Sequence, residues 1–260
     1  MNSQALETEA AFADSEYVSF EHDLSINQRF FEKYAHPRYW CDWRQFAAHL
    51  MGDVAGKTIL DYGCGMGEEA VFFAKLGAHV TAVDISPVGI EITRKRADYN
   101  GIAEYVDALT VDATHTGFPS NHFDIVHGLG ILHHVGIEEG LTEVFRVLRP
   151  GGTAVFLEPM GNSHQIEGIK HWIYRRFGRR LDLRKINDRE ENLKMKDILV
   201  STRRFEYFRA YPYRLLFRLR KLLFPRVLYP TIEKIDYLLL KVLPFLGYYA
   251  GAVVIHLRKQ

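Results

Sequence analysis

Between residues 57 and 158, short apolar runs alternate with helical stretches, and this alternation constrains the fold more than any other feature of the chain. The predicted strands cover residues 57–61, 80–84, 108–112, 123–127 and 153–158. The predicted helices cover residues 68–76, 87–99 and 138–148. Strands that alternate with helices of about 10–15 residues are typical of βαβ units. The sequence therefore predicts a doubly wound, mostly parallel α/β sheet.

A loop with three glycines at alternate positions follows the first predicted strand and opens the first predicted helix. The glycines are Gly63, Gly65 and Gly67. Without a Cβ, the backbone can turn sharply and approach a ligand closely. The helix N-terminus adds unpaired N–H groups and the positive end of the helix dipole, which suit an anionic group. A plain glycine turn between a strand and a helix is the alternative interpretation.

Aspartates end the next two predicted strands. Asp84 can accept hydrogen bonds from both hydroxyls of a ribose, as acids in this position do in dinucleotide sites. A helix N-cap is the alternative, but Ser86 before Pro87 already suits that role. Asp112 can accept from an adenine amino group, or it is a turn aspartate. With Asp61, these acids mark the strand ends where ligands bind in open α/β sheets.

Five segments, in their order and spacing, resemble the class I S-adenosylmethionine-dependent methyltransferase family. They are LDYGCGMG (60–67), AVDIS (82–86), VDA (111–113), FDIVHGLGILHHV (123–135) and RVLRPGG (146–152). The last two look closest to the subgroup that includes the quinone-biosynthesis methyltransferases. The resemblance implies a Rossmann-like sheet of seven strands with an antiparallel last strand. Residues 205–209 and 248–257 fit the sixth and seventh strands.

The same resemblance implies S-adenosylmethionine as the cofactor. The residues implied to contact it are Asp61, Gly63, Cys64, Gly65, Gly67, Asp84, Ile85, Asp112, Ala113 and Gly128. Among them, the glycine loop would line the methionine portion, with Asp61 near its ammonium group. Asp84 would hold the ribose, and Asp112 with Ala113 the adenine edge. Gly128 would lie beside the methionine and the sulfonium.

Methyl transfer is an in-line displacement, and a carbon or oxygen acceptor can also require removal of a proton. His133 and His134 follow the fourth strand beside the expected sulfonium, and histidine titrates near neutral pH. Glu158 and His164 are further candidates for this base. The alternatives are that one histidine is structural while the other packs under the helix, and that no base is used.

The sequence divides into three predicted regions. Residues 1–50 combine a start, 1–16, that is expected to be disordered or loosely attached with lid helices between 25 and 50 that Pro37 interrupts. Residues 51–160 form the cofactor-binding core, and 161–260 supply substrate-side helices and the last two strands. Aromatic residues of the first region are candidates for a lid or an apolar substrate wall, although such stripes more often form helix core. They are Tyr17, Phe20, Tyr34, Trp40 and Trp43.

Charge is distributed unevenly. Residues 170–226 carry 18 Lys and Arg against 6 Asp and Glu, a net charge of +12. This basic segment indicates an anionic partner, or a solvated helical face that balances the acidic part of the chain. Residues 212–246 mix apolar and basic side chains, which predicts a lid over an apolar acceptor, with peripheral membrane contact as a second role. A membrane-spanning helix over 235–257 is not expected, because Lys241, Pro244 and Gly247 interrupt it.

The sequence thus predicts a methyltransferase for a small apolar, lipid-like or natural-product-like acceptor, methylated at oxygen or carbon. The segment EPMGN (158–162) resembles a subset with such substrates. No metal site is expected, because neither Cys41 nor Cys64 has a ligand partner at the usual spacing. Free cysteines and an N-terminus without a signal pattern fit the cytoplasm.

Three alternatives stay open. An NAD(P)-dependent oxidoreductase would share the glycine loop and Asp84, but it prefers G-x-G-x-x-G and does not explain Asp112. A nucleic-acid methyltransferase would use the basic segment, although no recognised RNA-binding motif accompanies it, so a nucleic-acid partner is not expected. A cofactor-binding scaffold without turnover is the third. The acceptor, the accepting atom and the oligomeric state are not determined by the sequence.

Overall fold

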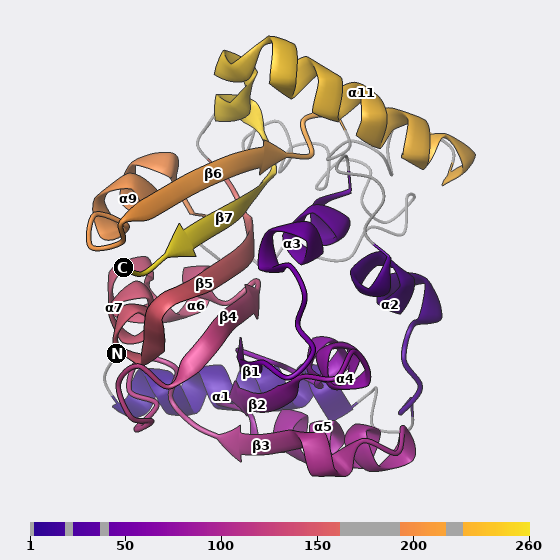
Figure 1. Cartoon of the computed structure of the whole chain (residues 1–260), viewed down its shortest axis with the longest axis vertical. Coiled ribbons are helices and arrows are strands. Elements are labelled where there is room, and N and C mark those ends of the chain that lie inside the picture. Colours follow the sequence, from indigo (N-terminus) through magenta and orange to yellow (C-terminus); the bar gives the residue numbers. More distant parts are fainter. Residues whose placement is uncertain (1–2, 19–22, 37–41, 162–192, 217–225) are drawn as a thin grey trace.

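The computed structural model describes residues 3–18, 23–36, 42–161, 193–216 and 226–260. Its centre is a seven-stranded sheet in the order β3-β2-β1-β4-β5-β7-β6 (Figure 1). The strands are β1 (Thr58–Tyr62), β2 (His79–Asp84), β3 (Val106–Thr110), β4 (Phe123–Leu129), β5 (Leu148–Pro159), β6 (Tyr207–Tyr213) and β7 (Ala252–Arg258). Only β7 runs antiparallel to its neighbours β5 and β6. The predicted doubly wound sheet with an antiparallel last strand is confirmed.

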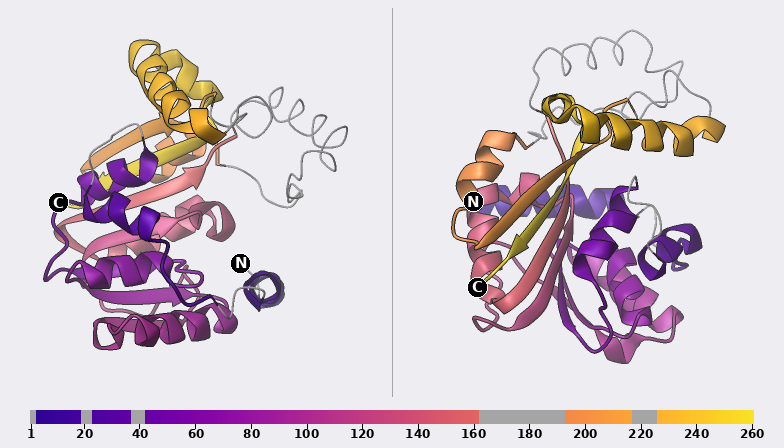
Figure 2. Two further views of the ribbon diagram at one scale, coloured as in Figure 1. Left: turned by 90° about the vertical axis from the view of Figure 1, so that its right-hand side faces the viewer. Right: turned by 45° about the horizontal axis from the view of Figure 1, so that its top comes forward.

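Helices cover both faces of the sheet and create two apolar layers (Figure 2). On one face lie α2 (Gln28–Ala35), α3 (Trp43–Met51), α4 (Glu68–Lys75) and α5 (Pro87–Tyr99). On the other lie α6 (Leu132–Val135), α7 (Ile137–Val147) and α9 (Met195–Ser201). The buried central strands β1 and β4 contribute side chains to both layers, as expected for a parallel sheet covered on two sides.

Local sequence signals set the starts of the helices that follow β1 and β2. Helix α5 begins at Pro87, and the Ser86 hydroxyl accepts a hydrogen bond from the Gly89 N–H at 2.9 Å. Helix α4 begins after Gly67, which adopts a left-handed conformation with φ of 73°. The N-termini of both helices therefore lie at the carboxyl edge of the sheet, where a ligand can reach them.

The N-terminus differs from the prediction. Residues 1–16 were predicted to be disordered, but α1 (Ser3–Tyr17) is a helix that packs along α5. Alanine, glutamate, glutamine and leucine favour the helix locally, and the Asp14 carboxylate accepts hydrogen bonds from the Ser86 hydroxyl and the Val88 N–H. Tertiary contact thus orders a segment whose polar composition suggested disorder. Phe20, Pro37 and Trp40 lie outside the described residues.

The C-terminal part also differs in detail. Strand β6 ends at Tyr213, so the first residues of the predicted lid segment 212–246 complete a strand. The remainder contains η4 (Arg226–Leu228), helix α11 (Tyr229–Val242) and the 3₁₀ segment η5 (Pro244–Tyr249), and η5 delays the start of β7 to Ala252. In the described ranges, no helix combines the length and the apolar character that crossing a membrane requires.

Two further strand boundaries move. Strand β3 covers 106–110 instead of 108–112, so Asp112 lies in the turn beyond the strand. Strand β5 begins at Leu148 instead of Thr153, because the Arg-Pro-Gly-Gly segment continues the extended chain. Both shifts concern the ends of strands. There, residue propensity is a weak guide, and pairing with the neighbouring strand determines where the strand begins or ends.

Candidate cofactor-binding site

A cavity of about 580 Å³ opens at the carboxyl edge of β1, β2 and β4. Eight of the ten predicted cofactor residues line it: Asp61, Gly63, Cys64, Gly65, Asp84, Ile85, Asp112 and Ala113. The other two, Gly67 and Gly128, lie behind the wall. Gly67 precedes α4, and Gly128 lies inside β4 where a Cβ would meet the side chains of Phe156 and Ile131. Chain segments that are distant in sequence therefore meet at one cavity.

The glycine loop follows the cavity wall in a backbone conformation that favours glycine. Gly63 and Gly65 have φ of 74° and 54°, in the left-handed region that side chains rarely adopt. A Cβ on Gly63 would also lie 2.6 Å from the Ile131 side chain. The Gly65 N–H donates to the Asp84 carboxylate at 2.9 Å, which ties the loop to the end of β2. Both conformation and space therefore require glycine at Gly63.

Asp84 is held rigidly in the cavity wall. One carboxylate oxygen accepts from the Gly65 N–H and the other from the Ser86 N–H, each at 2.9 Å. Burial raises the pKa of Asp84, while these two backbone hydrogen bonds lower it. Asp112 is held differently, because its Oδ1 accepts from the backbone N–H and the hydroxyl of Thr114 at 2.8 Å. Asp112 is therefore a turn aspartate that also lines the cavity.

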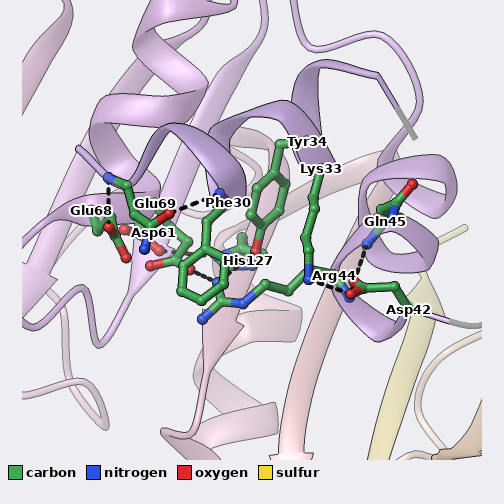
Figure 3. Close-up of polar contacts among 11 residues, drawn as sticks. Phe30, Lys33, Tyr34, Asp42, Arg44, Gln45, Asp61, Glu68, Glu69 and His127 are labelled. Atoms are coloured by element: carbon green, nitrogen blue, oxygen red, sulfur yellow. Dashed lines mark hydrogen bonds and ion pairs between the residues drawn. The ribbon is translucent and has the colours of Figure 1, made fainter. Parts of the chain in front are cut away.

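The third acid, Asp61, has a buried partner that the sequence did not reveal (Figure 3). His127 Nδ1 lies 3.1 Å from Asp61 Oδ1, and the two residues face each other in register on β4 and β1. Phe73 and Tyr34 pack against the imidazole, with centroid distances of 4.9 and 6.1 Å. Burial raises the pKa of Asp61, and His127 lowers it. A histidine in an apolar strand was the available signal.

Asp61 lines the cavity and retains one buried carboxylate oxygen without a side-chain partner. Within the described part of the chain, Asp61 Oδ2 and His127 Nε2 are both buried and lack a hydrogen-bond partner. An ionised carboxylate can only accept, so Nδ1 carries the proton that joins the pair when Asp61 is charged. Because leaving a buried charged oxygen unsatisfied is costly, this atom fits a cationic donor supplied by a ligand.

A second polar cluster brings the N-terminal helices to the cavity (Figure 3). Arg44 of α3 forms an ion pair with Glu69 of α4, and its guanidinium lies 4.6 Å from the Phe30 ring centroid. Burial lowers the pKa of Arg44, but Glu69 and Tyr34 together outweigh this effect and raise the pKa overall. Glu68 accepts from the Asn27 N–H at 3.1 Å. Arg44, Glu68 and Glu69 line the cavity, and no motif in the sequence indicated them.

Helix α1 forms one wall of the cavity. Its lining residues are Leu6, Glu9, Phe12, Ala13, Glu16 and Tyr17. The Tyr17 hydroxyl would lie 3.2 Å from a Cβ on Gly65, and burial raises the pKa of Tyr17. Of the other aromatic candidates, Tyr34 packs on Phe72 and Phe73, and Trp43 stacks against Arg214 at 3.7 Å. Tyr17 is therefore the described aromatic candidate that reaches the cavity.

The candidate bases separate into two environments. His133 Nδ1 lies 2.8 Å from Glu158 Oε2, and Glu158 Oε1 accepts from the N–H groups of Ile131 and Leu132. This buried pair holds the loop after β4 and lies behind the cavity wall. His134 lines the cavity, and its Nδ1 lies 2.9 Å from Glu9 Oε1 of α1. His164 lies outside the described residues.

Comparison with known proteins relates the central part of the chain to methyltransferases. Residues 59–152 match the family model described as a methyltransferase domain. A demethylmenaquinone methyltransferase from Clavibacter sepedonicus is 38% identical over 117 residues, 45% of this chain and 46% of the relative. A sterol 24-C-methyltransferase from Gibberella zeae is 32% identical over 129 residues, 48% of this chain and 34% of the relative. The chain thus spans less than half the length of these curated relatives.

Among solved structures, geranyl diphosphate C-methyltransferase from Streptomyces coelicolor A3(2) superposes with a TM-score of 0.58 at 17% identity. The superposition covers 83% of this chain and 79% of that one, and at this identity it supports the fold alone. The sequence left a nicotinamide-dependent oxidoreductase open as an alternative, and the domain match favours a methyltransferase over it. Residues 59–152 thus match a methyltransferase domain, and this segment resembles the quinone-biosynthesis methyltransferases.

Proposed function

We propose that this protein transfers a methyl group from S-adenosylmethionine to carbon or oxygen of a small apolar acceptor. The observation that carries the proposal is one cavity that joins the glycine loop to Asp61, Asp84 and Asp112. The unpartnered Asp61 Oδ2 suits the cofactor ammonium, and the immobilised Asp84 suits the ribose hydroxyls. Asp112 and Ala113 suit the adenine edge. The residues present therefore fit this cofactor by the chemistry of their donors and acceptors.

The bound cofactor supplies an activated methyl group on a sulfonium, and the protein supplies alignment, exclusion of water and control of charge. Aligning two reactants lowers the barrier by up to about 7–11 kcal/mol. Helix α1 covers the cavity and helps to exclude water. His134 acts as general base, because it lines the cavity and Glu9 orients it. It takes the proton of the acceptor as the methyl–acceptor bond forms and the methyl–sulfur bond breaks.

Two observations support an apolar acceptor. The cavity wall includes Leu6, Phe12, Leu129, Ile131 and Val135 alongside the acids. Three of the similar proteins are named for demethylmenaquinone, a sterol and geranyl diphosphate. A panel of such compounds, incubated with cofactor labelled in the methyl group, identifies the acceptor by transfer of the label. Absence of transfer to any apolar member, with transfer to a polar one, would contradict this part of the proposal.

Calorimetry with S-adenosylhomocysteine tests the cofactor assignment. Asp84→Ala removes an acceptor of charge-assisted hydrogen bonds, so the binding free energy should weaken by about 1.5–3 kcal/mol. Asp107→Ala is the matched control, because Asp107 is an exposed aspartate on the neighbouring strand β3. Circular dichroism confirms folding of both variants. Unchanged affinity in Asp84→Ala, or binding of NAD in place of S-adenosylhomocysteine, would contradict the assignment.

A further inference from the structure

Helix α11 turns a row of apolar side chains outward. Ile235, Leu238 and Val242 are 44%, 58% and 72% exposed. Their spacing of three and four residues places them on one face of the helix. Two further exposed apolar side chains follow along the chain: Leu243, the C-cap of α11, and Phe245 of η5, which is 68% exposed. We call these five side chains the α11 face. Figure 1 shows α11 at the β6–β7 end of the sheet, opposite β3.

The opposite, inner side of α11 packs against the rest of the protein and holds the helix in place. Ile232, Asp236 and Leu240, spaced by four residues, are buried. Asp236 accepts a hydrogen bond from the Leu216 N–H at 2.7 Å, next to β6. The α11 face is therefore additional to the side that anchors the helix. Scattered exposed apolar residues are ordinary, but a contiguous row marks an interaction surface.

Charges on α11 are segregated in the same way. The acids Glu233 and Asp236 belong to the inner side, where they line a small cavity together with Trp43 and Arg214. Lys234 and Lys241 are exposed, four residues before and three residues after Leu238, so they flank the α11 face. Over residues 212–246 the sequence carries seven Lys and Arg against two acids. Both of these acids are the inward-facing ones.

This arrangement of apolar and charged side chains favours one kind of partner. An apolar row bordered by lysines, with the acids turned away, fits an anionic lipid surface: apolar side chains enter the acyl boundary while lysines meet the headgroups. A second copy of the chain would bring the lysines of both α11 helices close together, which is unfavourable. We propose that the α11 face docks the protein on an anionic membrane. This inference does not depend on the methyl-transfer reaction.

Sedimentation of the full chain with vesicles tests the proposal. Binding is expected to vesicles of phosphatidylcholine with phosphatidylglycerol, to be weaker with phosphatidylcholine alone, and to fall as salt rises. Leu238→Glu with Val242→Glu should abolish it. Lys234→Gln and Lys241→Gln should each weaken it about fivefold. Leu199→Glu, at an exposed leucine of α9, should leave it unchanged.

Two results would overturn the proposal: no sedimentation of the parent protein with anionic vesicles, or equal binding by the Leu238→Glu/Val242→Glu variant. Sedimentation velocity without lipid tests the alternative partner of the α11 face, a second copy of the chain. Self-association that this double variant abolishes would assign the α11 face to a second copy and also overturn membrane docking. Calorimetry with S-adenosylhomocysteine, expected to be unchanged in every variant, shows that the cofactor site stays folded and separates this test from that of the proposed reaction.

Discussion

The cavity edge of the sheet and the α11 face distribute polarity in opposite ways. At the cavity edge, Asp61, His127 and Asp84 are buried. On α11, Ile235, Leu238 and Val242 are exposed. Folding alone favours neither arrangement, because burying charge costs free energy and exposing apolar surface forgoes its burial.

In each region, the proposed partner would supply an interaction that the folded chain leaves unmade. A buried carboxylate with an unused oxygen gains its missing partner from a ligand, and an exposed apolar row gains its burial from a surface. The cavity edge is supported by backbone hydrogen bonds and by an imidazole in an aromatic environment, so it is preorganised for a small ligand. The α11 face consists of side chains from one side of α11 and from the segment just after it, which suits a broad, unspecific partner.

The largest expected difference concerns the rate of methyl transfer. His134→Ala should lower kcat about 10²–10⁴-fold, because it removes the proposed base. Cofactor affinity should stay nearly constant, since the base acts on the acceptor. Lys241→Gln on α11 is the control and should keep the parent kcat with a water-soluble acceptor analogue. If chemistry is rate-limiting and the His134→Ala variant turns over as fast as the parent, His134 is not the general base.

The next effect concerns stability at the buried pair. His127→Leu leaves the Asp61 carboxylate without its partner and should cost about 3–5 kcal/mol of unfolding free energy. Urea unfolding measures it. Burial raises the pKa of Asp61 above 3.8, so acidification neutralises this carboxyl in the folded variant, and the loss should be smaller at acidic pH than at pH 7.

A second variant makes this test specific to the pair. Asp61→Leu with His127→Leu replaces both polar groups, so the double variant should recover much of the stability that His127→Leu loses. S-adenosylhomocysteine should nevertheless bind the double variant weakly, because the acid proposed to meet the cofactor ammonium is gone. If both variants were equally unstable, the histidine would contribute through packing, and its role as the partner of Asp61 would be rejected.

The smallest effect is expected on the α11 face. Leu238→Ala should change the unfolding free energy by no more than about 0.5 kcal/mol, because the exposed side chain contributes little to folding. Leu240→Ala on the inner side of the same helix should cost about 2–5 kcal/mol. Parallel denaturation curves measure both. A comparable loss in Leu238→Ala would show that the α11 face is part of the protein core and would end the contrast between the two regions.

A structural feature can be predicted from the sequence when residues close together in the chain determine it, and it is missed when distant residues do. The glycine loop, the N-cap at Ser86 and the acid that ends β2 are local signals, and the structure places them as expected. The disorder predicted for 1–16 was wrong, because α1 is ordered by contacts to a helix about seventy residues away. The roles assigned to individual site residues stay predictions.

Periodicity, glycine positions and strand-end acids determined the sheet, its layers and the edge at which a cofactor can bind, because each reflects backbone geometry over a few residues. Only the tertiary structure decided that His127 is the partner of Asp61, 66 positions away. Only the tertiary structure separated His133 beside Glu158 from His134 beside Glu9, although the two histidines are adjacent in sequence. Helix α11 likewise shows which leucines face the protein only once it is packed on β6. Pairings across strands and helices depend on how elements register and pack, and no local pattern carries that information.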